Sequence, residues 1–183
     1  FSGELTITIA GNKSVEVINT TGNVEVKDVT DATVKVTTGQ GKIVATNCNG
    51  KMDFTTKNGS LKVNDMKGDI RMASSRGGMT LDNVDGTLTV DGMDGALVAN
   101  MIKGDMNIAT TAGTQTYTRV EGTMKLKAST GAIKVSNFKG DLTVNTLAAT
   151  LNLFEVEATM HINLGGKGQI VGTKGITLTG SSE

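Results

Sequence analysis

The sequence predicts an all-β protein that folds as a single-domain parallel β-helix, or β-solenoid, of about ten eighteen-residue coils. The main observation is a glycine, or an alanine in its place, that recurs every eighteen residues, at Ala32, Gly50, Gly68, Gly86, Gly104, Gly122, Gly140 and Ala158. A second series falls midway between these positions, at Gly41, Gly59, Gly77, Gly95, Gly113, Gly131 and Ala149. A fixed period in this range is typical of a solenoid, in which each repeat stacks on the next.

Each stretch between two glycines predicts one short strand. Counting forward from the glycine, the second and fourth residues are apolar, as Leu61 and Val63 are after Gly59, and the residue between them is polar, as Lys62 is. This period-two alternation, bounded by turn residues, indicates a strand with one buried face. Two such units make one coil, and glycine suits a turn that passes through positive φ. We expect the coils to wind in the right-handed sense.

The two corners of the coil differ in composition. One corner is small and polar, at Thr37-Thr38, Thr55-Thr56, Ser74-Ser75, Thr110-Thr111 and Ser129-Thr130. The other carries an apolar residue two positions before the glycine, at Cys48, Met66, Val84, Ile102, Val120, Phe138 and Val156. Equivalent residues of adjacent coils stack ~4.8 Å apart, so we expect these seven to form one buried apolar column. Four members of the column are preceded directly by an asparagine or aspartate, residue types that tolerate the left-handed conformation of a turn. They are Asn47, Asp65, Asn83 and Asn137.

A row of charges lies next to the glycines of the apolar corner. Their signs alternate coil by coil, in the order Lys67, Asp85, Lys103, Glu121, Lys139, Glu157 and Lys174. Stacking would place opposite charges above one another, which predicts a ladder of salt bridges along one edge. Exposed pairs contribute only about 0–1 kcal/mol each, so the ladder would serve mainly to set the register of the coils.

The two ends of the domain, which covers residues 1–183, depart from the period. We expect irregular terminal coils over residues 1–22 and 165–183. Each end still contains a short β-rich segment without proline, and its apolar residues are Leu5, Ile7 and Ile9 at one end and Ile176 and Leu178 at the other. Natural proteins normally cover such edges, so we expect these segments to pair with another copy and form a head-to-tail homo-oligomer or filament.

Composition excludes several classes of partner. The chain has 18 basic and 18 acidic side chains and a net charge of zero, so it has no electrostatic reason to bind nucleic acid or an anionic membrane. No apolar run approaches the ~20 residues that a bilayer span requires. The chain begins with Phe1, and we interpret it as processed or excerpted, with no signal or anchor visible.

No residue set predicts a catalytic centre, a cofactor or a metal. His161 has no second histidine as a partner, and the single cysteine, Cys48, belongs to the apolar column and is expected to be inert. The densest acidic stretch cannot pool its oxygens for calcium, because the period assigns its members to opposite corners, Asp82 and Asp85 at one and Asp91 and Asp94 at the other.

Two kinds of corner alternate from about Gly22 to Gly175, one small and polar and the other with the pattern Asn-apolar-Lys-Gly-Asp. This pattern resembles the adhesin-like β-solenoid repeats of bacterial surface proteins, a group that includes putative auto-transporter adhesin heads. Bactofilins are a looser likeness in architecture. The resemblance implies a β-helix at the cell surface or outside the cell, without catalysis, and offers no functional residues to carry over.

We therefore expect a non-enzymatic structural or adhesive element that associates with itself and, in addition, with cell-surface or matrix components. One alternative is a polysaccharide-binding or polysaccharide-cleaving β-helix, although the corners are short and exposed aromatics are scarce. The other is a passive module of a larger envelope protein.

Overall fold

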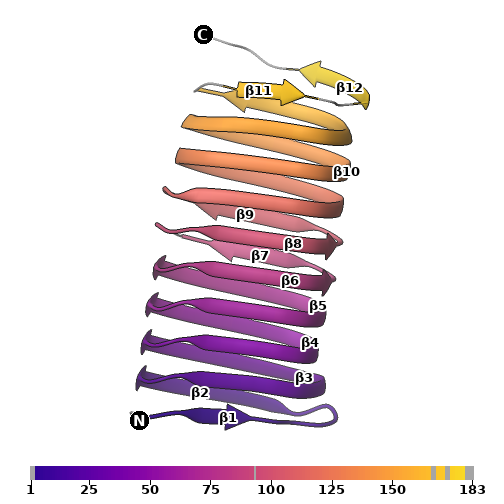
Figure 1. Cartoon of the computed structure of the whole chain (residues 1–183). Helices are drawn as coiled ribbons and strands as arrows, with labels where there is room; N and C mark the ends of the chain where they lie inside the picture. The colour runs from indigo at the N-terminus through magenta and orange to yellow at the C-terminus, as the bar shows by residue number, and fades with distance from the viewer. Residues whose placement is uncertain (1–2, 93, 166–167, 172–173, 180–183) are drawn as a thin grey trace.

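A computed structural model describes residues 3–92, 94–165, 168–171 and 174–179 of the chain, and its side chains as far as residue 165. The protein is all-β, with 85% of residues in strands and no helix in the described part. Its parallel strands form a single sheet wound into a β-solenoid, which confirms the predicted fold class. The rod begins at the N-terminal coil and ends at the C-terminal coil, so the two termini lie at opposite ends (Figure 1).

Twelve strands make up the described sheet. They are β1 (Leu5–Ile7), β2 (Ser14–Thr21), β3 (Val24–Gln40), β4 (Ile43–Asn58), β5 (Leu61–Arg76), β6 (Met79–Asp85), β7 (Leu88–Asp91), β8 (Leu97–Lys103), β9 (Met106–Thr110), β10 (Thr114–Leu164), β11 (Gly168–Val171) and β12 (Lys174–Thr179).

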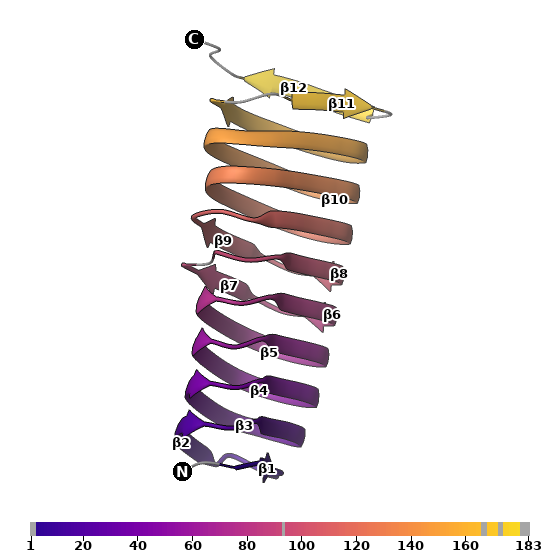
Figure 2. The same ribbon diagram turned by 60° about the vertical axis from the view of Figure 1, so that its left-hand side comes forward.

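Many strands are longer than the two short strands per coil that the sequence predicts. β4 covers both predicted strands of its coil, and β10 winds through several coils as one strand of 51 residues (Figure 2). The reason is that the apolar corner bends at isolated residues of positive φ, such as Asn47 and Gly50, which turn the chain without ending its pairing with the coils on either side.

Register follows the predicted period along most of the rod. Ile43 pairs with Leu61 and Leu61 with Met79, a step of eighteen residues. The solenoid has about seven turns, whereas the sequence-based count of about ten included the terminal segments, where the spacing changes. Val24 pairs with Ile43, a step of nineteen, and Leu151 pairs with Gly168, a step of seventeen.

A β-bulge near the N-terminal end contains the one residue by which the nineteen-residue step exceeds the usual eighteen. Val29 pairs with Cys48 but Ala32 pairs with Gly50, so the step falls from nineteen to eighteen between these two pairs. Asp28, just before this shift, and Asp31, within it, both have positive φ, 52° and 49°. An extra residue in one strand of a pair is the usual origin of a bulge.

The core is a set of stacked side-chain columns inside the rod. All seven residues of the predicted apolar column are at most 4% exposed, and successive members such as Cys48 and Met66 pair in register. The small polar corner also faces inward, because Thr38, Thr56 and Ser74 are at most 3% exposed. Thr38 Oγ1 donates to Thr56 Oγ1 of the next coil at 3.0 Å.

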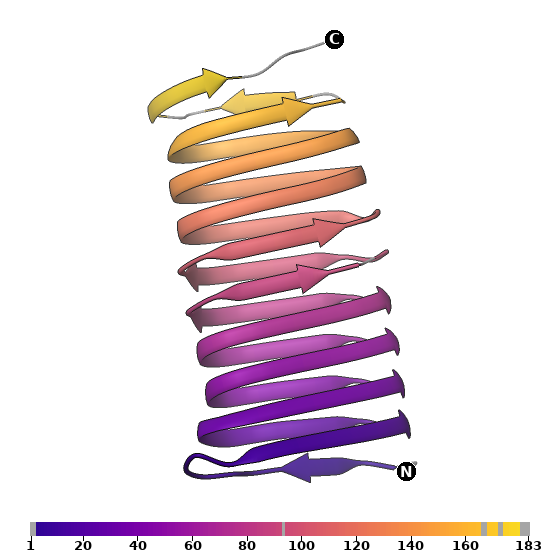
Figure 3. The ribbon, with the colours of Figure 1, turned by 180° about the vertical axis from the view of Figure 1, so that it is seen from behind.

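The corner glycines are required for two reasons. Gly68 has a φ of 112°, a conformation that L side chains rarely adopt. A Cβ built on it would also overlap the backbone carbonyl oxygen of Gly50 in the coil below. The sequence predicted the first reason, whereas the second follows only from the close stacking of the coils, which all views of the rod show (Figure 3).

Candidate functional site

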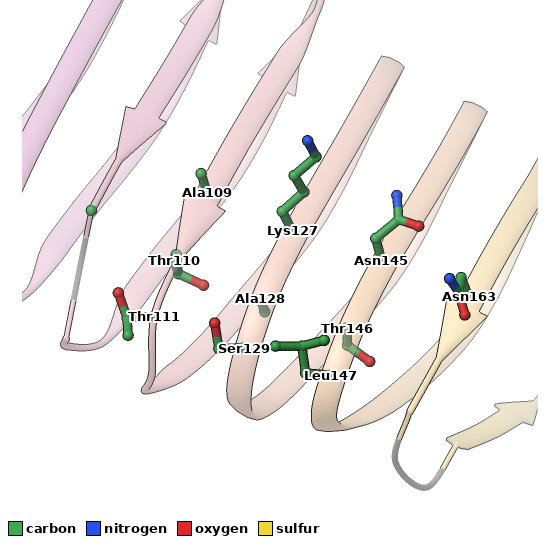
Figure 4. Close-up of a pocket in the computed structure, with 11 residues that line it drawn as sticks. Ala109, Thr110, Thr111, Lys127, Ala128, Ser129, Asn145, Thr146, Leu147 and Asn163 are labelled. Atoms are coloured by element: carbon green, nitrogen blue, oxygen red, sulfur yellow. The ribbon is translucent and has the colours of Figure 1, made fainter. Parts of the chain in front are cut away.

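A groove that contains a lysine lies at the small polar corner. Its volume is about 380 Å³, and it is lined by residues of β9 and β10, by Thr111 after β9 and by Gly92, which follows β7. Sites for small ligands usually occupy ~300–1,000 Å³, so the groove is large enough for a small ligand or part of a longer one. It is an open surface feature and not an enclosed cavity (Figure 4).

The groove exists because the chain turns inward at one position of each coil. Thr110, Ala128 and Thr146 occupy this position and are at most 8% exposed. The residues before and after them face outward and form two rows (Figure 4). One row contains Ala109, Lys127, Asn145 and Asn163, and the other contains Thr111, Ser129 and Leu147.

The polar groups of the groove are amides, hydroxyls and one cation. Among the described residues that line the groove, Lys127 is the only charged one and none is a carboxylate. Two acids lie next to the groove in the register, Asp91, which pairs with Ala109, and Asp94, which pairs with Ala112. Asp91 is already engaged, because Arg71 Nη2 donates to its Oδ2 at 2.9 Å. The charge of Lys127 is therefore not matched by an acid of the groove itself.

A buried hydrogen-bond chain lies below one end of the groove. Tyr117 Oη donates to Gln115 Oε1 at 2.7 Å, and Gln115 Nε2 donates to Thr110 Oγ1 at 2.6 Å. Tyr117 is 0% and Gln115 1% exposed, and burial raises the pKa of the Tyr117 hydroxyl well above its usual range. The chain links the core to the groove floor through Thr110.

Neither the groove nor this chain was among the predicted sites. A signal for the chain was present in the sequence, because Gln115 and Tyr117 are the second and fourth residues after Gly113, positions that are otherwise apolar. The groove itself depends on how deeply the corner bends, which residue types alone do not specify.

The predicted charge ladder has the expected register but not the expected contacts. Lys67 pairs with Asp85 and Asp85 with Lys103 across the coils. Yet the ion pairs within 4 Å among the described side chains lie elsewhere, at Lys27–Glu25, Lys35–Glu16 and Arg71–Asp91. The salt-bridge prediction is wrong in this part of the chain, since ordering two long exposed side chains costs more entropy than the screened attraction returns.

The other residues singled out in the sequence lie apart. Asp82 accepts a hydrogen bond from Asn100 Nδ2 at 2.6 Å, whereas Asp91 pairs with Arg71. The described residues contain no group of three or more His, Cys, Asp or Glu side chains that could hold a metal. His161 is exposed on β10, and Cys48 is buried, which raises the pKa of its thiol and keeps it protonated.

The turn positions before the apolar column adopt the left-handed conformation. Asn47, Asp65, Asn83 and Asn137 have φ between 52° and 55°, which confirms the prediction for them. Two neighbouring pairs are bonded across coils, because Asn47 Nδ2 donates to Asp28 Oδ1 at 2.7 Å and Asn83 Nδ2 to Asp65 Oδ1 at 2.6 Å. The same conformation occurs at three residues that do not favour it, Met101, Arg119 and Glu155.

The terminal edges are formed by short strands. Leu5 and Ile7 belong to β1, and Ile9 lies just beyond it. Ile176 and Leu178 belong to β12, whose side chains lie outside the described part of the structure. Leu178 pairs with Met160 through the backbone.

The chain was compared with known protein families, curated proteins and solved structures. No protein family matches the chain, and no curated protein or solved structure shows a significant similarity to it. A search of the described residues for a helix with the length and apolar character of a membrane span found none.

Proposed function

We propose that the chain is a non-enzymatic structural and adhesive element of the bacterial cell surface whose copies join end to end. The observation that carries this proposal is that both ends of the described sheet are open. β1 and β2 pair only with β3 among the described strands, and β11 and β12 pair only with β10. Unpaired strand edges are templates for another chain.

Hydrogen-bond direction identifies the groups that face outward at the N-terminal end. The Leu5 amide donates to Asn23 O at 3.0 Å, so it points into the stack. Residues alternate along a strand, and the amide of Thr6 therefore points away from the stack. The Thr6 amide is available to the carbonyl of a second copy.

The two ends match each other in position. The column that begins with Leu5 of β1 continues through Val24, Ile43 and Leu61, and ends at Gly168 of β11, which pairs with Leu151. The column that begins with Val15 of β2 ends at Leu178 of β12 in the same way. β11 and β12 of one copy can thus pair with β1 and β2 of the next in the parallel sense.

This contact is heterologous and does not close on itself, so it generates filaments or open head-to-tail oligomers. The net charge of zero removes long-range repulsion between copies. Placement at the cell surface, with cell-surface or matrix components as further partners, is supported by the resemblance of the repeats to adhesin-like solenoids.

Light scattering across a range of protein concentration, with electron microscopy of the same samples, tests self-association. Thr6→Pro removes the outward amide without removing the Leu5 bond to the stack, and it should abolish the oligomers. Thr6→Val keeps the amide and should behave as the unmodified chain. A chain that remains monomeric at high concentration would contradict self-association and favour the passive module.

A further inference from the structure

We infer that the groove at the small polar corner binds a linear glycan that carries carboxylate groups, such as a chain containing uronic acids. This inference deepens the adhesive part of the proposed function and rests on it. It names the chemistry to which the surface would adhere.

The direction of the groove selects a long ligand. Each of its rows takes one residue per coil, so Lys127 and Asn145 are eighteen residues apart in the sequence and one coil apart in space. Coils are ~4.8 Å apart, which makes each row a regular array along the axis of the rod. A polymer lying along the axis would meet one residue of each row at every coil.

The spacing of this array disfavours an extended peptide. A peptide strand advances ~3.3 Å per residue and would soon lose step with side chains placed every ~4.8 Å. A sugar ring is larger than an amino-acid residue, so a linear hexose chain advances by about one coil spacing per sugar. Successive sugars would therefore present their hydroxyl groups to Asn145 and then to Asn163.

The polar groups of the groove fit a polyhydroxylated ligand. An asparagine amide offers two donors and an acceptor, and a serine or threonine hydroxyl offers both functions. Asn145 and Asn163 project from one row at one end of the groove, and Ser129 and Thr111 belong to the other row, in the coils of Lys127 and Ala109 (Figure 4). Leu147 is 75% exposed beside them and provides apolar surface for the C–H face of a sugar ring.

The charge of the groove specifies an acidic glycan. Lys127 provides a cation where no lining residue provides a carboxylate, and Asp91 at the groove's end is occupied by Arg71. One lysine is too few for a nucleic acid, since tight binding to phosphates requires several cations along the groove. The carboxylate of the uronic acid that lies beside Lys127 would match its charge.

The test is isothermal titration calorimetry of the full chain with hexagalacturonate, with a neutral hexasaccharide and poly-glutamate as comparisons. Hexagalacturonate should bind, and Lys127→Gln should weaken its binding about three- to tenfold. Lys125→Gln is the matched control, because Lys125 is an exposed lysine on the same strand that does not line the groove. Binding should also weaken as salt is added.

Three results would overturn the inference. They are no binding of hexagalacturonate, equal loss of binding in Lys127→Gln and Lys125→Gln, and poly-glutamate binding as tightly as the glycan. Binding of the neutral hexasaccharide as tightly as hexagalacturonate would overturn the acidic specificity. Self-association is measured separately by light scattering, so failure here leaves it standing, and a monomeric chain that binds the glycan would separate the two proposals.

Discussion

Tyr117 donates its hydroxyl hydrogen to the side-chain oxygen of Gln115 at 2.7 Å inside the rod, where neither residue is more than 1% exposed. In the coil below, the residue in register with Gln115 is Leu97. A polar pair thus replaces an apolar layer of the core. It is tolerated because Gln115 also donates to Thr110, so that both ends of its amide are bonded.

The first prediction concerns this pair. Tyr117→Phe should lower the free energy of unfolding by about 1–3 kcal/mol, because Gln115 Oε1 is then buried without a partner. Gln115→Leu alone should cost a similar amount, since the Tyr117 hydroxyl loses its acceptor. The double variant should recover most of the lost stability, because replacing both partners by apolar groups leaves no buried polar group without a hydrogen-bond partner at position 117.

Urea unfolding of the wild type, the two single variants and the double variant gives the free energies of unfolding for a complete double-mutant cycle. Losses that simply add in the double variant would show that the two side chains do not depend on each other.

The second prediction concerns alkaline pH. Burial raises the pKa of both Tyr117 and Cys48 in the folded state, so folding favours their protonated forms. Stability from these groups is fully present below their unfolded pKa values and is lost as pH rises above them, from about pH 8.5 for the thiol and about pH 10 for the tyrosine. The slope for each group approaches about 1.4 kcal/mol per pH unit.

Tyr117 is the only tyrosine and the chain has no tryptophan, so tyrosinate absorbance reports on it alone. Absorbance and circular dichroism recorded together from pH 8 to 12 should show ionisation only as the fold is lost. Tyrosinate forming near its ordinary pKa while the β signal persists would contradict the burial of Tyr117.

The fold was predictable from the sequence because a solenoid repeats one local rule. The spacing of the glycines and the alternation after them locate each strand and its inward face, as at Leu61 and Val63, which are both at most 1% exposed. The turn asparagines were predictable for a similar reason, since Asn47 and Asn83 tolerate positive φ by their own chemistry.

Two kinds of feature were not predictable: contacts that depend on where the end of a side chain lies, and concavities that depend on how far the backbone turns inward at a corner. Lys67 and Asp85 have the register the sequence indicated, yet they do not form an ion pair, because register places their backbones and not the ends of their side chains. The groove beside Lys127 depends on how far the corner turns inward at Ala128 and Thr146. That depth is a property of several coils together.

The third prediction compares two adjacent glycines. Gly77 has a φ of 136°, and a Cβ there would overlap the carbonyl oxygen of Gly59. Gly78 is outside the positive-φ region, and the nearest atom to its Cβ is the Ala96 oxygen at 3.6 Å, an ordinary contact. Gly77→Ala should cost about 3 kcal/mol or more, whereas Gly78→Ala should change stability by about 0.5 kcal/mol or stabilise slightly.

Thermal unfolding followed by circular dichroism separates the two variants, and the soluble yield provides a second measure if Gly77→Ala fails to fold. Equal melting temperatures for the two would show that the coils are not stacked as closely as described.

The last prediction concerns Met101, which is 40% exposed and has a φ of 53°. A non-glycine residue in this conformation costs about 1–2 kcal/mol, and asparagine relieves part of that cost by bonding locally. Asn83 has the same conformation at the equivalent position of the coil below, with a φ of 55°. Met101→Asn should therefore stabilise the protein by about 0.5–1 kcal/mol, which raises the melting temperature by ~1–4 °C.

Met101→Ala is the matched control, because it removes the exposed apolar side chain but keeps the unfavourable conformation. Calorimetric melting temperatures should rise for Met101→Asn and remain near the wild-type value for Met101→Ala. If alanine stabilises as much as asparagine, the cost at this position comes from the exposed methionine side chain and not from the left-handed backbone.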